Sequence, residues 1–133
     1  MQRVFLDANV LFSAAYRAQA GLLRLWRLAG VELMTSDYAV QEAVANLTDS
    51  AQRNRLTKLL KTLAIIPHPR VMPSLPAGVH LPEKDVPILQ AALAVGAAVL
   101  LTGDKTHFGR YFGKKIGGVR ILPPGDFLRE WEQ

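Results

Sequence analysis

The chain has 133 residues, half of them hydrophobic and a fifth charged, which is the composition of one compact domain and argues against intrinsic disorder. It has no cysteine and no apolar run of the roughly 18 residues that a membrane span needs, so disulfides, thiol chemistry and membrane insertion are excluded, and a cytoplasmic protein without a signal peptide is expected. The formal net charge of +5 suits a nucleic-acid partner, although from the charge alone an ordinary solvated surface is the preferred explanation.

The first half of the chain alternates short apolar strands with amphipathic helices. A strand is predicted over residues 3–7, followed by helices over 8–17 and 20–28 and a second strand over 31–35. Two further helices are predicted, one capped by Ser36 or Asp37 and the next beginning at Asp49 or Ser50. The segment AIIP, residues 64–67, is the third predicted strand.

The second half repeats this alternation after a proline-rich loop over 67–82, where no regular structure is expected. Its predicted elements are a helix over 83–95, a strand over 97–102, a short helix capped by Asp104, a fifth strand over 119–122 and a closing helix over 124–131. Neither half looks self-sufficient, so residues 1–133 are expected to form a single domain. Short, fully apolar strands between helices predict an α/β three-layer sandwich with a mostly parallel sheet of roughly five strands.

Acidic side chains are expected at one edge of this sheet. Asp7 ends the first strand inside the apolar run RVFLDANVLF, and Asp104 follows the fourth strand. Asp85 falls on the apolar face of its helix, in the first turn. Right-handed crossovers bring the carboxyl ends of the strands and the first turns of the following helices to the same edge, where open α/β sheets bind ligands. The three carboxylates are therefore expected to converge.

Each acid also has a purely structural explanation. Asp104 can cap its helix, and Asp85 can complement the helix dipole, which is worth roughly 0.3–1 kcal/mol at a surface. Glu42 lies off the apolar stripe of its helix, which by itself indicates a solvated side chain. Asp7 is the hardest to explain in this way, because burying a carboxylate without a partner costs several kcal/mol.

A divalent cation would remove the repulsion among these carboxylates. Oxygen ligands without a histidine or cysteine cluster favour a hard ion, Mg²⁺ or Mn²⁺. Such an ion can activate water for phosphodiester cleavage, with a basic surface holding nucleic acid beside it. Two basic groups suit that surface, Arg53, Arg55, Lys58 and Lys61, and Arg110, Lys114, Lys115 and Arg120.

Four segments, in this order, resemble the PIN-domain family: LDANVLFSA, YAVQEAVANL, KDVPILQAALAVGAAVLLTGDKTHF and ILPPGDFL. The resemblance covers essentially the whole chain. It implies a metal-dependent endoribonuclease and, because many members are VapC-type toxins, the toxin of a type II toxin–antitoxin pair. RNA as substrate, an antitoxin protein as partner and a homodimeric assembly are implied with it.

The resemblance also implies roles for individual residues. By position, the acids that bind the metal and serve catalysis are Asp7, Glu42, Asp85 and Asp104. Asn9 matches the polar residue that orients the first acid, and Thr102 matches the hydroxyl residue near the metal. Glu42 is thereby moved from a solvated position to the rim of the cleft. The sequence assigns no residue to nucleic-acid binding.

His107 departs from the family pattern, since many members carry a further acid there. The resemblance therefore implies one carboxylate fewer and a single ion rather than two. For His107 itself, a structural role such as capping its helix is preferred to a contact with phosphate. His68 and His80 lie in the proline-rich loop, and nothing indicates that they are ligands.

Two other functions are compatible with these patterns. A receiver-type phosphotransfer domain also has an acid at the end of a strand, but it needs an acid pair after the first strand and a lysine after a late one. Lys105 directly follows Asp104, which fits that arrangement badly. The other alternative is a catalytically silent RNA-binding module of the same fold, for which RNA binding would persist without cleavage stimulated by Mg²⁺.

Overall fold

The computed structural model describes residues 1–67 and 72–132, so His68 lies outside the described residues. One six-stranded sheet runs through it in the order β3-β2-β1-β4-β6-β5. The strands are β1 (Gln2–Leu6), β2 (Val31–Ser36), β3 (Ala64–Ile66), β4 (Val99–Leu101), β5 (Lys115–Ile116) and β6 (Val119–Leu122). All pairings are parallel except that of β5 with β6. The predicted α/β class and mostly parallel sheet are confirmed.

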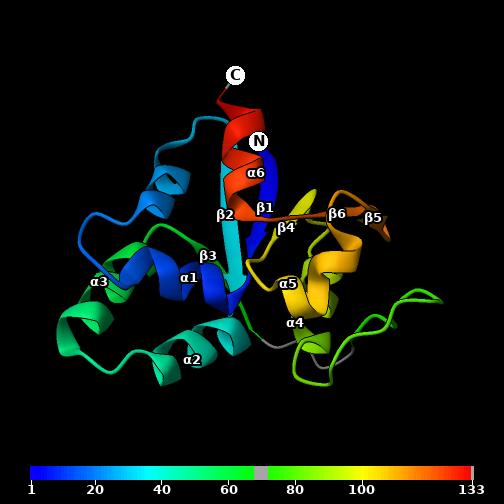
Figure 1. Cartoon of the computed structure of the whole chain (residues 1–133), viewed down its shortest axis with the longest axis horizontal. Coiled ribbons are helices and arrows are strands. Elements are labelled where there is room, and N and C mark those ends of the chain that lie inside the picture. Colours follow the sequence, from blue (N-terminus) through cyan, green and yellow to red (C-terminus); the bar gives the residue numbers. More distant parts are fainter. Residues whose placement is uncertain (68–71, 133) are drawn as a thin grey trace.

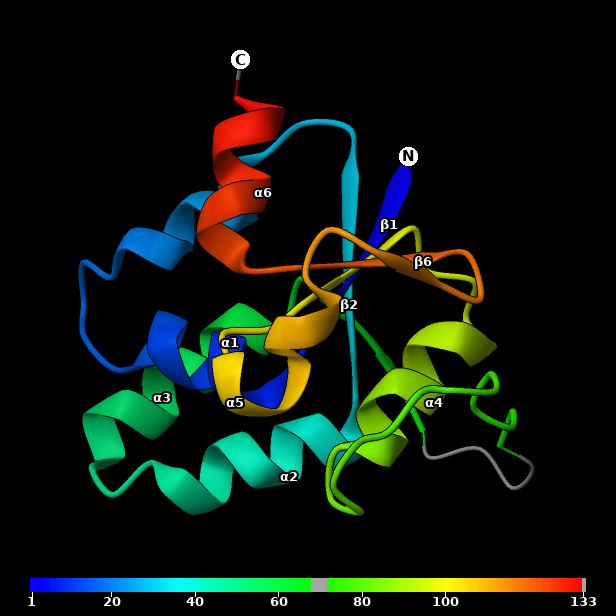
Figure 2. The same cartoon turned by 45° about the vertical axis from the view of Figure 1, so that its right-hand side comes forward.

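Helices cover both faces of the sheet. They are α1 (Ala8–Ala15), η1 (Gly21–Arg27), α2 (Asp37–Asn46), α3 (Ser50–Leu60), α4 (Val86–Ala94), α5 (Lys105–Phe108), η2 (Gly109–Tyr111) and α6 (Pro124–Trp131). In Figure 1 and again in Figure 2, α1, η1 and α3 lie on one side of β1 and β2, and α4 lies on the other. The central strands are apolar and fully buried between these layers, with Val4, Phe5, Leu6, Leu100 and Leu101 all inaccessible to solvent.

Three elements differ from the predictions. The helix predicted over 83–95 begins at Val86, so Asp85 is the residue before it and not part of its first turn. Residues 21–27 form a 3₁₀ helix rather than an α-helix. Leu22, Leu25 and Leu28 recur every three residues, and a 3₁₀ helix stacks side chains at that spacing on one face. The two-residue strand β5 was not predicted. It pairs with β6 through Gly117 and Gly118, both at positive φ, a backbone conformation that glycine adopts without a steric penalty.

The strand order changes direction between β1 and β4. The chain leaves β1 toward β2 and leaves β4 toward β6, so the two connections diverge on opposite sides of this pair. Open α/β sheets bind ligands outside the carboxyl ends of strands at such a reversal. The backbone amide of Asp7 donates to the carbonyl of Leu101 over 3.0 Å, which fixes the two strand ends side by side. The predicted acids therefore follow the strands at the point where a site is favoured.

Among the residues that the structure describes, none of the helices has the length and apolar composition needed to cross a bilayer.

Candidate functional site

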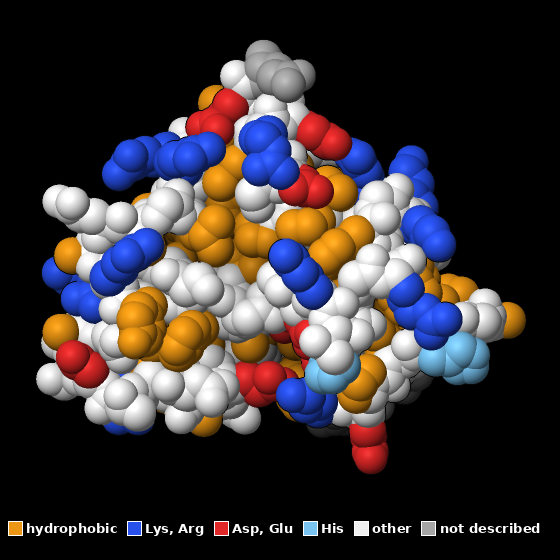
Figure 3. All heavy atoms as spheres, in the orientation of Figure 1, with side chains coloured by type: hydrophobic (Ala, Val, Ile, Leu, Met, Phe, Trp, Pro, Cys, Tyr) orange, Lys and Arg blue, Asp and Glu red, His pale blue; other side chains and the backbone are white. Residues whose placement is uncertain are grey.

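A cleft of about 600 Å³ opens at the carboxyl edge of the sheet. Its lining includes all four predicted acids, Asp7, Glu42, Asp85 and Asp104, together with Asn9 and Lys84. Figure 3 shows acidic side chains beside a histidine in a hollow at the lower centre of this face. The acids come from four separate elements or their junctions, so the fold gathers them as the sheet topology predicted.

Asp7 is 4% exposed and every oxygen of its side chain accepts a hydrogen bond. Oδ1 accepts the amide of Ala8 over 2.6 Å, which caps α1. Oδ2 accepts hydrogen bonds from the Thr102 hydroxyl over 2.8 Å and from the side-chain amide of Asn9 over 3.2 Å. Burial nevertheless raises the pKa of Asp7 to about 6, with the charges of Asp85 and Glu42 adding to the effect and the hydrogen bonds opposing it. The carboxylate is positioned, but none of the described Lys, Arg or His side chains forms an ion pair with it.

Asn9 and Thr102 join the two strand ends above the cleft floor. Oδ1 of Asn9 accepts the backbone amide of Gly103 over 2.8 Å, and its Nδ2 donates to the Thr102 hydroxyl over 3.2 Å. The Thr102 hydroxyl also accepts the backbone amide of Asp104 over 3.2 Å. The residues after β1 and β4 therefore form one hydrogen-bonded unit. In it, Asn9 bonds both to Asp7 and to the loop after β4.

Asp85 and Asp104 meet around His107. Nδ1 of His107 lies 2.8 Å from Oδ2 of Asp85 and 2.7 Å from Oδ2 of Asp104. The other oxygen of Asp104 accepts the backbone amide of His107 over 3.1 Å. The cap predicted for Asp104 is thus present, and it occupies only one of the two carboxylate oxygens. Asp85 precedes α4 but its side chain caps nothing.

Three buried side-chain atoms in or beside the cleft make no well-aligned hydrogen bond with any residue that the structure describes. They are Oδ2 of Asp85, Oε1 of Glu42 and Nδ1 of His107. The imidazole nitrogen is close to both carboxylates, yet its N–H is aligned with neither. Burial raises the pKa of Asp85, the charge of His107 opposes that rise, and the charge of Asp104 adds to it. Buried acceptors without donors fit a divalent cation, which would satisfy oxygen atoms from several side chains together.

Tyr38 connects α2 to the residue that precedes Asp85. Its hydroxyl donates to the carbonyl of Lys84 over 2.7 Å. Burial raises the pKa of Tyr38 to about 12, and the carboxylate of Glu42, one helical turn away, contributes to that rise. The phenol is therefore a neutral donor that helps to set the distance between α2 and the start of α4. In the sequence, the four-residue spacing of Tyr38 and Glu42 indicated that the two side chains lie on the same face of their helix.

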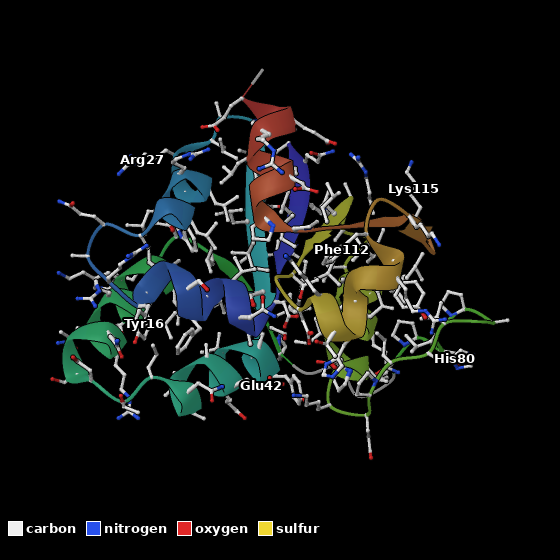
Figure 4. All side chains as sticks on the ribbon, viewed as in Figure 1. Tyr16, Arg27, Glu42, His80, Phe112 and Lys115 are labelled. Carbon is white, nitrogen blue, oxygen red and sulfur yellow. The ribbon has the colours of Figure 1, made fainter. Side chains whose placement is uncertain are left out.

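The structure changes two predictions about single residues. Glu42 does not have the solvated position that its helical wheel suggested, because one of its oxygens is buried in the cleft. Figure 4 labels it on α2, far from His80. The imidazole of His107 does not cap the helix; it lies between two acids. Its position three residues after Asp104, hence on the same helical face, was the available signal.

The pKa of Asp7 gives a prediction for stability without metal. Between about pH 4 and 6 the folded chain keeps a proton on Asp7 that the unfolded chain releases, so this stabilisation is present at low pH and lost as pH rises through about 6. We expect Asp7→Asn to resist urea better than the wild type at pH 8 in EDTA, by at most about 3 kcal/mol. The gain should shrink toward pH 4.

The matched control is Asp49→Asn, which changes the exposed cap of α3. It should show no gain that depends on pH in this way. Parallel pH profiles for the wild type and Asp7→Asn would contradict the prediction.

Comparisons with known proteins agree with the fold described above. No curated protein matches the chain in sequence. A chain from the crystal structure of VapBC2 from Rickettsia felis, bound to a DNA fragment from their promoter, superimposes with a TM-score of 0.66. The two share 17% identity over 92% of this chain and 98% of that one, which shows a common fold. The family model of the PIN domain matches residues 3–106, and the chain therefore belongs to the PIN-domain family.

Proposed function

We propose that the protein is a metal-dependent endoribonuclease that hydrolyses phosphodiester bonds of RNA. The observation that carries this proposal is the cleft at the strand-order reversal of a PIN domain, into which four acids converge with buried oxygens that lack donors. Carboxylates crowded in this way need a cation. A nuclease uses such a cation on a phosphodiester, whereas a receiver domain needs a lysine after a late strand in the site; Lys105 does not line this cleft, and Lys84, which does, precedes α4 instead of following a strand.

Asp7, Glu42, Asp85 and Asp104 are the residues that would hold Mg²⁺ or Mn²⁺. When bound, such an ion acts as a Lewis acid that activates water and neutralises charge on the phosphate. Asp7 enters the reaction already oriented by Thr102 and Asn9. Oε1 of Glu42, which receives no aligned hydrogen bond from the described residues, would be free to serve as a ligand of the ion. Hydrolysis of this kind needs neither a covalent intermediate nor the 2′-hydroxyl, so RNA as substrate rests on the family.

Substitution of the acids tests the proposal. Asp7→Asn and Asp85→Asn should each lower cleavage of a defined single-stranded RNA by about a hundredfold or more, because removing a group that stabilises developing charge has effects of this size. Cleavage by the wild type should require Mg²⁺ or Mn²⁺ and stop with EDTA. The assay measures product formation on denaturing gels with pure protein.

Asp49→Asn is again the control, since it removes one carboxylate outside the cleft. Full activity of the Asp7→Asn, Asp85→Asn double variant would refute the assignment of the site. RNA binding without any metal-stimulated cleavage by the wild type would favour the silent RNA-binding module.

The path of the nucleic acid is proposed to run from the cleft along α1 and η1. A neighbouring hollow of about 650 Å³ shares Phe12, Ser13 and Leu22 with the cleft and adds Tyr16 and Arg17. The ring of Tyr16 is 53% exposed, as required of an aromatic that stacks on an unpaired base. Arg17 is exposed and makes no ion pair with any described residue, so its charge is available to phosphate.

The two basic groups expected from the sequence are partly committed to the fold. Arg55 donates to the carbonyls of Ala15 and Tyr16 at the end of α1. Arg120 forms a two-pronged ion pair with Glu130. Arg24 and Arg129 of the neighbouring hollow are likewise paired with Glu132 and Asp126. Arg17, together with Lys84 at the cleft, is therefore the better candidate for phosphate contact.

Charge reversal at Arg17 tests this path. In the Asp7→Asn background, which is expected to bind without cleaving, Arg17→Glu should weaken the binding of single-stranded RNA and lower the slope of log Kd against log salt by about one. Lys115→Glu, on β5 and outside this path, changes the net charge equally and lies far from Glu42 in Figure 4. Equal effects of the two reversals, measured by fluorescence anisotropy, would exclude this path.

We also propose that the protein is the cytoplasmic toxin of a type II toxin–antitoxin pair, with an antitoxin protein as partner and a homodimeric assembly. Support comes from the fold that the chain shares with a chain of a VapBC2 complex. An antitoxin that covers the basic, acid-centred cleft would block access of RNA to the acids.

Induced expression in a bacterial host provides the test. The wild type should arrest growth, whereas Asp7→Asn should not, because arrest depends on cleavage. Growth is measured by optical density, and immunoblotting checks for equal protein levels. Normal growth with active wild-type protein would exclude the toxin role and leave the ribonuclease proposal intact.

A further inference from the structure

We propose that His107 is a direct metal ligand through Nδ1, and that the cleft consequently prefers Co²⁺ or Mn²⁺ to Mg²⁺. The site would be formed by Asp85, Asp104 and His107, whose ligand atoms all lie within 4.8 Å of one another. This inference rests on the metal site of the proposed function, and it replaces the oxygen-only ligand set expected from the sequence with a mixed oxygen–nitrogen set.

The spacing of the atoms supports ligation. Nδ1 of His107 lies 2.8 Å and 2.7 Å from the Oδ2 atoms of Asp85 and Asp104. Neighbouring ligands on a six-coordinate ion with bonds of about 2.1 Å lie about 3 Å apart. Three side chains from two separate junctions, one before α4 and one at α5, therefore present single atoms at the separation that a shared ion imposes.

A simple ion pair explains the cluster less well. A protonated imidazole has one hydrogen on Nδ1, and sharing it between two carboxylates gives two bent hydrogen bonds, each weaker than an aligned one. Here Nδ1 is in close contact with both carboxylates but forms a well-aligned hydrogen bond with neither, and Oδ2 of Asp85 receives no aligned hydrogen bond from any described residue. Asp85 is 6% exposed, so its oxygen cannot be satisfied by bulk water. A buried carboxylate oxygen 2.8 Å from an imidazole nitrogen, which carries a lone pair when it is not protonated, fits a cation bound by both atoms.

The imidazole is held for this purpose by its own short helix. Asp104 caps α5 by accepting the backbone amide of His107. The next residue, Phe108, is fully buried in the core, which fixes the rotation of α5. His107 is then directed at the cleft side, with the side chain about one quarter exposed at 27%. This arrangement sets the ligand before any ion binds, which lowers the ordering entropy of binding.

An imidazole ligand changes which ion is favoured. Nitrogen ligands suit first-row transition ions, whereas Mg²⁺ prefers oxygen ligands and retains its waters. Replacing a carboxylate by a neutral imidazole also removes a negative charge, which weakens the attraction of a hard ion. Both effects favour Co²⁺ or Mn²⁺ over Mg²⁺ at this site.

Isothermal titration calorimetry of the full chain with CoCl₂, MnCl₂ and MgCl₂ tests the inference. The wild type should bind Co²⁺ and Mn²⁺ more tightly than Mg²⁺. His107→Asp, which substitutes an oxygen ligand, should lower the ratio of Co²⁺ to Mg²⁺ affinity by about tenfold or more. His107→Asn carries no added charge and should lower the ratio as well, which covers the case in which the extra acid of His107→Asp impairs folding. His80→Asn removes an exposed histidine far from the cleft and should leave the ratio unchanged.

A spectroscopic measurement identifies the ligand atom directly. Electron spin-echo spectra of the Mn²⁺-loaded wild type and of His80→Asn should show ¹⁴N modulation from a bound imidazole, and those of His107→Asp should not. An affinity ratio that His107→Asp and His107→Asn leave unchanged, or a wild-type spectrum without ¹⁴N modulation, would overturn this inference. RNA cleavage that still requires metal would then leave the proposed ribonuclease standing, whereas failure of the wild type to bind any ion would contradict both.

Discussion

A carboxylate buried at the end of a central strand is the constraint to which the rest of the cleft responds. Asp7 is almost inaccessible to solvent, and an isolated charge there would oppose folding. The chain meets this demand locally with the amide of Ala8 and at long range with the Thr102 hydroxyl. Since Thr102 belongs to the loop after β4, satisfying one acid also aligns the loop that carries Asp104.

Three of the acids occupy the same kind of position in the fold. Asp7, Asp85 and Asp104 each occupy the residue immediately before a helix, at the start of α1, α4 and α5. The positions of Asp7 and Asp104 directly follow the parallel strands β1 and β4 and so share one edge of the sheet, whereas Asp85 reaches that edge through the loop between β3 and α4. Asp7 and Asp104 each use one oxygen to cap a helix; the other oxygen of Asp7 accepts hydrogen bonds from Thr102 and Asn9, that of Asp104 contacts His107, and Asp85 caps nothing. The structural and the proposed functional explanation of these acids are therefore complementary.

Most of this arrangement could be predicted, because it follows from strand order and from single residues set against their surroundings. Asp7 stands out in an apolar run, and Asp85 lies on the apolar face of its helix, so each signals a special environment. Glu42 could not be placed from its wheel, since a residue beside the apolar stripe is buried or exposed according to the neighbouring helix. His107 was missed for a related reason: its contacts depend on α4, whose first turn follows a long loop of unpredictable path. The 3₁₀ helix and β5 are short elements whose form does not follow from the hydrophobic pattern alone. The three-residue spacing of leucines decides the first, and the two glycines of the turn decide the second.

Capping by Asp7 and Asp104 has an evolutionary consequence. An asparagine at either position can still accept the amide that an aspartate accepts, and the codons of the two residues differ at a single base. A lineage of such domains can therefore abandon chemistry in one mutational step while keeping a stable shape and an intact surface for recognition. Under the proposed function, the change from a ribonuclease to a catalytically silent domain of the same fold would therefore require little structural change.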